Sequence, residues 1–254
     1  MTAGGPSSVA AAPRAGWLAW LLLALAWSAT LGSHSVFDPD EGRYAEIPRE
    51  MVASGDWVTP RLNGLPYFEK PALQYWATAL FYEIGGVSEA ASRLWAFGLA
   101  FACLPLVAWL ATALGLSRAT GFRAAAFLAV SPFYVLLGHI NLLDQAFAFT
   151  TMVPPASTSA AAVLSKGIAA LVLAGGTIVV HAILHRDKDI LHRLQLWPGL
   201  LLFFAVTVPW FVLVEHANPG FAQFFFIHEH FARFLTKVHD RAGPELQAVE
   251  DVLV

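Results

Sequence analysis

The sequence predicts an all-α, polytopic membrane protein with about five transmembrane helices, plus interfacial helices in its first extracytoplasmic loop. Composition is the first reason. Of the 254 residues, 57% are hydrophobic and 13% are charged, whereas soluble domains carry about 25% charged residues. The second reason is that uncharged segments recur along the chain, each near the roughly 20 residues needed to cross a bilayer.

Charge and cysteine content exclude several other classes of protein. The net charge of −3 leaves no basic surplus for binding nucleic acid. Cys103 is the single cysteine, so an intrachain disulfide and a cysteine-rich metal site are both excluded. Because Cys103 stands in an apolar run, we expect it to pack as a small apolar side chain.

The N-terminal part of the chain predicts a first membrane span. We expect residues 1–16 to form a disordered cytoplasmic tail, because they are rich in Ala, Gly, Pro and Ser. No charged residue occurs between Arg14 and Asp38, which leaves room for one span. A cleaved signal peptide is the alternative, since Ala24 and Ala26 resemble a small-residue cleavage site. Both interpretations place the residues after Asp38 outside the cytoplasm.

Four further spans follow from the uncharged segments. They are 94–117, 124–143, 163–184 and 196–214, and the third of these is interrupted near its start by Lys166. Arg118 and Arg123 are predicted to bracket a tight turn between the first two of these. The aromatic segment 71–86 is too short to span and is expected to lie at the membrane interface. Between Asp144 and Lys166, two prolines and a Ser/Thr run predict a loop or a re-entrant segment.

The distribution of charge sets the predicted topology. With a cytoplasmic N-terminus, residues 1–16, 116–123 and 185–195 hold six basic residues and two acids. Loop 38–93, on the opposite side, holds nine acids and five basic residues, in agreement with the positive-inside rule. The alternation therefore gathers most charged candidates on one extracytoplasmic face. These are Asp40, Glu41, Glu69, Lys70, Asp144, Lys166 and residues 228–233. The predicted organisation is a transmembrane domain at 17–235 followed by a C-terminal tail at 236–254.

Two acid-containing pairs make the first loop the leading candidate for a site. Asp40 and Glu41 can cap and begin a helix, or aim two carboxylates at a ligand such as Mg²⁺ or Mn²⁺. Glu69 and Lys70 can be charges that reach the membrane surface, or the lysine can hold a phosphate as a point charge. Both alternatives stay open for each pair.

Charged side chains at membrane depth form a second group of candidates. Asp144 and Lys166 flank apolar segments, where charges are costly and often functional. Further on, His228, Glu229 and His230 contain metal-binding residue types. Their H-E-H order lacks the i, i+4 histidine pair of a zinc helix, so an interfacial helix with polar decoration is the alternative.

Several stretches together resemble a known family. They are DPDEGRYAEIPREMVASGDWVTPRLNGLPYFEKPALQYWATA, the turn at 141–144, Ser165-Lys166-Gly167 and NPGFAQFFFIHEHFARFLTKVHDRAGP. In these stretches the chain is similar to the bacterial lipid A 4-amino-4-deoxy-L-arabinose transferases. These belong with the dolichyl-phosphate-mannose protein mannosyltransferases among the C-type membrane glycosyltransferases. The family has further spans between the positions of Asp144 and Lys166 and beyond Pro244, so a truncated or internally deleted copy is expected.

The resemblance implies an activity and a location. It implies transfer of an aminoarabinose-like sugar from a polyprenyl-phosphate donor, such as undecaprenyl phosphate, to lipid A or a similar glycan acceptor. The protein would lie among the lipids of the bacterial inner membrane, with its active face periplasmic. The alternatives are a catalytically incomplete fragment or a non-enzymatic lipid-phosphate-binding membrane protein. A transporter is less favoured, because no matching halves carry paired broken helices.

The resemblance also implies roles for individual residues. Asp40 and Asp144 would be catalytic. Tyr67, Lys70, Lys166 and Arg233 would bind the donor phosphate. Glu69 and Glu41 would bind a divalent metal ion (Mg, Mn or Zn), and His228 would line the pocket.

Overall fold

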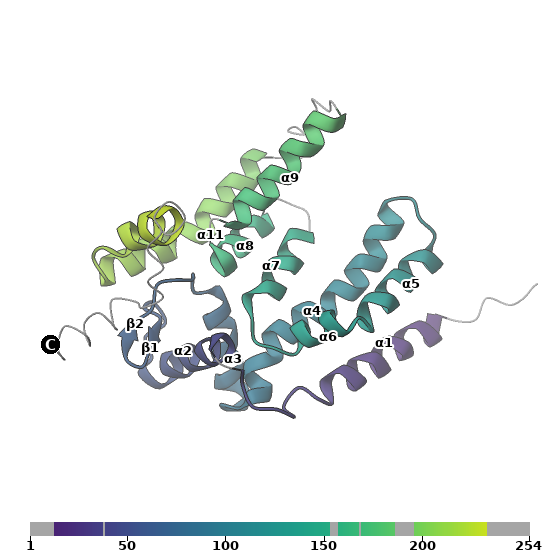
Figure 1. Cartoon of the computed structure of the whole chain (residues 1–254), viewed down its shortest axis with the longest axis horizontal. Helices are drawn as coiled ribbons and strands as arrows, with labels where there is room; N and C mark the ends of the chain where they lie inside the picture. Colours follow the sequence, from purple (N-terminus) through teal and green to yellow (C-terminus); the bar gives the residue numbers. More distant parts are fainter. Residues whose placement is uncertain (1–12, 38, 153–156, 168, 186–195, 233–254) are drawn as a thin grey trace, which may run out of the picture.

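The structure is a computed structural model that describes residues 13–37, 39–152, 157–167, 169–185 and 196–232. The described residues are mostly helical, which confirms the predicted all-α class. Their strands form one hairpin, in which each strand has two residues. The helices are α1 (Pro13–Ser28), α2 (Asp40–Ser54), α3 (Leu73–Gly85), α4 (Glu89–Ala113), α5 (Arg118–Ala129), α6 (Pro132–Gly138), α7 (Leu143–Met152), α8 (Ser157–Lys166), α9 (Ala169–His185), α11 (Leu196–Ala217) and the π-helix η1 (Gln223–Ala232). The strands are β1 (Arg61–Leu62) and β2 (Leu65–Pro66). Figure 1 shows α1 and α5 at one end of the molecule and α2 and the hairpin at the other.

Helix α4 connects the two ends of the molecule, and it is the one described helix long and apolar enough to cross a bilayer. Of its most apolar window, 28% is buried inside the protein, and many of the other residues there are half-buried. Cys103 is buried within α4, as its apolar surroundings predicted. The count of about five spans stays a prediction.

Two local predictions are wrong, one near α1 and one near α5. Helix α1 begins at Pro13, so the end of the predicted disordered tail is helical. Ser117 caps α5 by accepting a hydrogen bond from the Thr120 amide, so the turn precedes Arg118 and Arg123 lies inside the helix. The predicted span 124–143 corresponds to parts of α5 and α6, which together are long and apolar enough to cross a bilayer but are bent by 70° at the break, so this span stays a prediction.

The end of the molecule around α1 is held by a small core. Trp27 of α1 packs with Ala100 and Leu104 of α4 and Ala129 of α5. The indole Nε1 of Trp27 also donates a hydrogen bond to the Ala129 carbonyl at 3.2 Å. Gly121 allows the close approach of α4 and α5, because a Cβ there would lie 2.6 Å from the Ala108 carbonyl oxygen.

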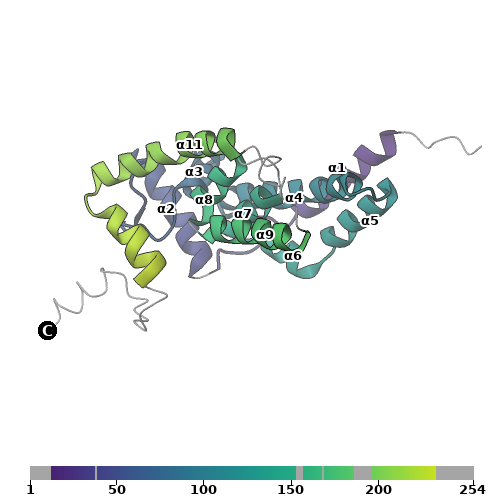
Figure 2. The ribbon, with the colours of Figure 1, turned by 90° about the horizontal axis from the view of Figure 1, so that it is seen from above.

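The other end is built on the first loop. Tyr44, Ile47 and Met51 of α2 share a buried cluster with Tyr75 of α3 and with aromatic and aliphatic residues near the C-terminal end of the described chain. These are Trp210 and Val214 of α11, Phe221 between α11 and η1, and Phe225 of η1. Two hydrogen bonds fix α11 to the loop. Trp210 donates to the Val58 carbonyl at 3.2 Å, and the Asn218 amide donates to the Thr59 hydroxyl at 2.8 Å. Figure 2 shows α11 lying along this end with η1 folded away from it.

The described residues between Asp144 and Lys166 are helical, so the loop alternative is wrong, and the re-entrant alternative stays a prediction. Helices α7 and α8 occupy it, and Pro154 and Pro155 fall in the gap between them. The hydroxyls of Thr150 and Thr151 donate to carbonyls three and four residues earlier. Because these hydroxyls are satisfied within the helix, the Ser/Thr content did not prevent its formation.

Candidate active site

Helix α2 begins at Asp40, and its first turn carries a cluster of polar side chains. The Asp40 side chain is 62% exposed, and its Oδ1 lies 3.3 Å from Nη2 of Arg43. Nη1 of Arg43 donates to the Tyr67 hydroxyl at 3.2 Å and lies 4.0 Å from a Glu69 oxygen. Arg43 therefore brings together three predicted site residues, Asp40, Tyr67 and Glu69.

The β-hairpin explains how Tyr67 reaches α2. Its two-residue turn is Asn63-Gly64, and both residues have positive φ, 54° and 81°. Asn-Gly is the sequence most typical of the turn that joins two twisted antiparallel strands. Leu62 pairs with Leu65, and the Tyr67 amide donates to the Pro60 carbonyl at 2.8 Å. The chain therefore returns beside α2, with Tyr67 and Glu69 facing Arg43.

Burial keeps Tyr67 protonated. It raises the pKa of the Tyr67 phenol above its ordinary value, and the nearby Glu69 carboxylate raises it further. Arg43 opposes this shift without reversing it. Burial alone lowers the pKa of Arg43, but Tyr67, Asp40 and Glu69 outweigh burial and raise it. The cluster therefore presents a permanent cation and a neutral hydroxyl beside an exposed carboxylate.

Asp144 and Lys166 form a second ion pair. Asp144 lies in the first turn of α7, and Lys166 is the last residue of α8. The Lys166 ammonium pairs with Oδ1 of Asp144 and lies 5.5 Å from the centre of the Phe147 ring. Gly167, with φ of +76°, ends α8 at this point. Both side chains are partly exposed, at 34% for Lys166 and 50% for Asp144.

One hydrophobic cluster supports both groups of charged residues. Leu143 precedes Asp144, and Leu164 lies two residues before Lys166. Both leucines are buried in the cluster that contains Tyr44 and Tyr67. The predicted site residues of α2, the hairpin, α7 and α8 therefore belong to one end of the molecule.

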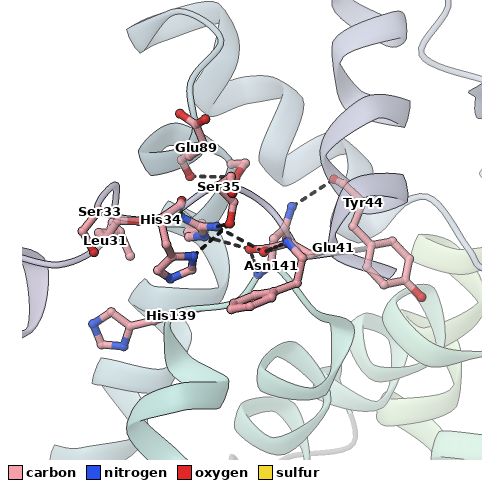
Figure 3. Close-up of polar contacts among 12 residues, drawn as sticks. Leu31, Ser33, His34, Ser35, Glu41, Tyr44, Glu89, His139 and Asn141 are labelled. Atoms are coloured by element: carbon pink, nitrogen blue, oxygen red, sulfur yellow. Dashed lines mark hydrogen bonds and ion pairs between the residues drawn. The ribbon is translucent and has the colours of Figure 1, made fainter. Parts of the chain in front are cut away.

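Glu41 faces the interior, away from this exposed cluster. Its side chain has no exposed surface and forms an ion pair with Arg93 at 2.8 Å; Figure 3 labels Glu41 within its group of polar contacts. Its two oxygens also accept hydrogen bonds from the amides of Phe37 and Asn141. A carboxylate offers about four acceptor positions, and all are used. The predicted role of Glu41 as a metal ligand does not fit this arrangement.

The described residues as a whole do not fit a divalent metal ion. Within the described ranges, no group of three or more His, Cys, Asp or Glu side chains could hold one. Between Asp40 and Glu69, the position open to a cation is taken by the Arg43 guanidinium. We therefore derive no chemical step from a metal.

Three predicted residues remain to be placed. Lys70 is half-buried and directly follows Glu69. His228 lies in η1, but its side chain falls outside what the structure describes. Arg233 lies outside the described residues altogether.

Sequence reasoning missed Arg43, Arg93 and Asn141. Arg43 follows Asp40 by three residues, a spacing that places two side chains on one face of a helix. Arg93 stands in the first part of a long apolar helix, and a charge at such a position is a functional candidate. Asn141 carried no comparable signal, because its contacts are made with residues distant in the sequence.

Comparison with known proteins adds the family. The model of the dolichyl-phosphate-mannose-protein mannosyltransferase family matches residues 15–157, more than half of the chain. The undecaprenyl phosphate-alpha-4-amino-4-deoxy-L-arabinose arabinosyl transferase of Shewanella sediminis is 34% identical over 243 residues, covering 84% of this chain and 43% of that protein. The undecaprenyl phosphate-alpha-4-amino-4-deoxy-L-arabinose arabinosyl transferase 2 of Sodalis glossinidius is 40% identical over 128 residues, covering 50% of this chain and 23% of that protein.

A solved structure is similar as well. The crystal structure of ArnT from Cupriavidus metallidurans bound to undecaprenyl phosphate superposes with a TM-score of 0.74 at 35% identity. The superposition covers 86% of this chain and 45% of that one. The chain thus spans less than half the length of the relatives that it matches.

Proposed function

The chain belongs to the dolichyl-phosphate-mannose-protein mannosyltransferase family, and from this premise we propose that it is a membrane glycosyltransferase that uses a polyprenyl-phosphate sugar donor. The names of its relatives support undecaprenyl phosphate as the lipid and aminoarabinose as the sugar. The proposed acceptor is lipid A or a similar extracytoplasmic glycan. The proposed location is the bacterial inner membrane, with several spans and a periplasmic active face.

One observation carries the proposal at the level of this chain. An exposed carboxylate, Asp40, is held by a guanidinium beside a buried hydroxyl and a second carboxylate. All four groups come from the loop that follows the first helix. Such a cluster can bind a polar sugar headgroup where the protein meets the membrane surface.

The proposed reaction breaks one bond and forms one bond. An acceptor oxygen attacks the anomeric carbon of the donor sugar, and the bond from that carbon to the phosphate oxygen breaks. The electron pair leaves with the lipid phosphate, so negative charge grows there. A hydroxyl acceptor also loses a proton, which Asp40 accepts as general base. An anionic phosphate acceptor needs no base, and Asp40 then orients it or pairs with an amino sugar.

Cations lower the barrier by stabilising the departing phosphate. We assign this role to Lys70, Lys166 and Arg233. Lys166 is already paired with Asp144, so the phosphate would compete with that carboxylate for the ammonium. Asp144 would then be released beside the reacting groups as the second catalytic carboxylate. Tyr67 would donate its hydrogen to the donor phosphate, because its raised pKa keeps it protonated.

The test is sugar transfer by the full chain in lipid vesicles. Undecaprenyl-phosphate aminoarabinose is supplied as donor with purified lipid A as acceptor, and modified lipid A is measured by mass spectrometry. We expect transfer by the wild type and loss of transfer in Asp40→Asn and Lys70→Ala. Glu46→Gln is the matched control, because Glu46 pairs with Arg49 at the same i, i+3 spacing on α2.

Two outcomes decide the proposal. Background transfer by the wild type would refute the enzymatic function of this chain. If that protein still bound undecaprenyl phosphate, the non-enzymatic lipid-phosphate-binding alternative would replace it. Equal transfer by the wild type and Asp40→Asn would refute the role of Asp40 and would leave the proposed enzymatic function standing.

A further inference from the structure

Arg93 is fully buried in α4, and every N–H group of its guanidinium has a partner. Nε and Nη2 donate to the two oxygens of Glu41, at 2.8 and 3.1 Å. The remaining hydrogens go to backbone carbonyls in the segment between α1 and α2. They reach Leu31 and His34 at 2.9 Å and Ser35 at 3.1 Å. An arginine has five N–H donors, and these five contacts use all of them.

Glu41 extends the same network in two directions. Its Oε2 accepts a hydrogen bond from the Phe37 amide at 2.8 Å, and its Oε1 accepts one from the Asn141 amide at 2.9 Å. The bonds from Arg93, Asn141 and Phe37 outweigh the effect of burial, which by itself would raise the pKa of Glu41, and hold that pKa below its usual value. Glu41 is thus a buried anion with both oxygens doubly occupied.

Asn141 carries the network to two more helices. Its side-chain amide donates to the Tyr44 carbonyl of α2 at 2.9 Å, and its oxygen accepts from Gln74 of α3 at 2.5 Å. Asn141 itself is fully buried. Figure 3 shows Glu41 and Asn141 meeting where these segments converge. One contiguous set of bonds therefore joins α2, α3, α4 and the residues before α7.

The residues of this network lie next to the two predicted catalytic acids in the sequence. Asp40 directly precedes Glu41, and Asp144 follows Asn141 by three residues. Pro39, at the start of α2, offers no side-chain cap. Glu41 reaches back to the Phe37 amide instead, much as an acidic residue does in a capping box. The first turns of α2 and α7, which carry the two acids, are therefore fixed by adjoining residues.

We propose that Arg93, Glu41 and Asn141 form a positioning network that sets Asp40 relative to Asp144. The role in catalysis rests on the proposed function. Glu41 and Asn141 are 100 residues apart in the sequence, and their bond ties the starts of the two helices together. Arg93 makes two bonds to Glu41 and three to backbone carbonyls from one rigid guanidinium group. A shift of one helix start therefore breaks several of these bonds at once. The network acts through Asp40 and Asp144 and does not touch the substrate.

Arg93→Lys is the main test variant. Lysine keeps the charge but cannot reproduce the planar fork of donors. We expect kcat to fall on the order of 10²-fold, the cost of misplacing a reacting group by about 1 Å. The KM for the donor is expected to change little, and the loss is normalised to the folded fraction. Arg49→Lys is the matched control, because Arg49 makes a bidentate pair with Glu46 on the surface of α2.

A double-mutant cycle separates positioning from mere stabilisation. If Arg93 acts through Asp40, Arg93→Lys has little further effect on the residual rate of Asp40→Asn. Full additivity of the two losses would overturn the proposal. Asn141→Ala is the milder variant, since it keeps the backbone bond to Glu41 and removes the side-chain links to Tyr44 and Gln74.

A distance measurement tests whether the network holds the starts of α2 and α7 in place, independently of activity. Spin labels are placed at Ala53 of α2 and Thr151 of α7, both exposed, in a Cys103→Ala background. The distance distribution is expected to broaden or shift in Arg93→Lys, and less so in Asn141→Ala. A distribution equal to the wild type in folded Arg93→Lys would overturn the proposal. An inactive wild type would refute the proposed function, and the distances would still decide whether the network holds the helix starts.

Discussion

Asp40 and Glu41 are adjacent acids in the sequence, and α2 turns them toward opposite surroundings. Glu41 has no exposed side-chain surface and accepts four hydrogen bonds. Asp40 is 62% exposed and forms an ion pair with Arg43. Because successive side chains on an α-helix point about 100° apart, adjacent residues face different partners. Two adjacent acids in the sequence therefore have different surroundings, and we expect them to have different roles.

The difference in burial separates two kinds of energetic effect. An exposed ion pair contributes about 0–1 kcal/mol to stability. Removing one partner of a buried pair costs about 3–5 kcal/mol, because the other charge is left uncompensated. We therefore expect changes at Asp40 to act on the reaction and changes at Glu41 to act on the fold.

The largest expected effect is the loss of activity in Asp40→Asn. If Asp40 is the general base of the proposed reaction, the rate of transfer to a hydroxyl acceptor falls about 10²–10⁴-fold. The melting temperature, measured by intrinsic tryptophan fluorescence in detergent, should match that of the wild type. A large drop in melting temperature would contradict the separation between the two acids.

The next largest effect is the loss of stability in Glu41→Gln. The substitution keeps the shape but leaves Arg93 as a buried charge without its counterion, so we expect a cost of about 3–5 kcal/mol. Denaturant titration of the detergent-solubilised protein measures it. The double variant Glu41→Gln/Arg93→Met should recover part of the loss, because it removes the uncompensated charge. No recovery would show that hydrogen bonds to the backbone, and not the charge, dominate the pair.

Acid should weaken the same pair. The pKa of Glu41 in the folded protein lies below the ordinary value of 4.5, so the unfolded chain binds the proton more readily. The resulting stabilisation is fully present at pH above 4.5 and is lost as the pH falls below it through the folded pKa. Melting temperatures at pH 6 and pH 3.5 test this. The drop should be smaller in Glu41→Gln, since other acids contribute equally to both proteins.

The sequence predicted the polar cluster better than it predicted its support. Asp40, Tyr67 and Glu69 lie in one short charged loop, so local spacing and the Asn-Gly turn carry much of their arrangement. The Arg93–Glu41–Asn141 network depends on pairings 52 and 100 residues apart. Periodicity has no information about such pairings. For the same reason the bend between α5 and α6 and the helices between Asp144 and Lys166 were not predicted.

The smallest expected stability effect concerns the second exposed pair, Asp144 and Lys166. Both side chains are partly exposed, so Lys166→Gln should change the free energy of unfolding by about 0–1 kcal/mol. The effect should shrink further in 1 M salt, where the screening length falls to about 3 Å. Denaturant titration at low and high salt, compared with Arg49→Gln on α2, measures it. A cost as large as that of Glu41→Gln would mean that exposure does not decide how an ion pair contributes here. If the cost is small while transfer is still lost, Lys166 belongs with Asp40 among residues that act on the reaction.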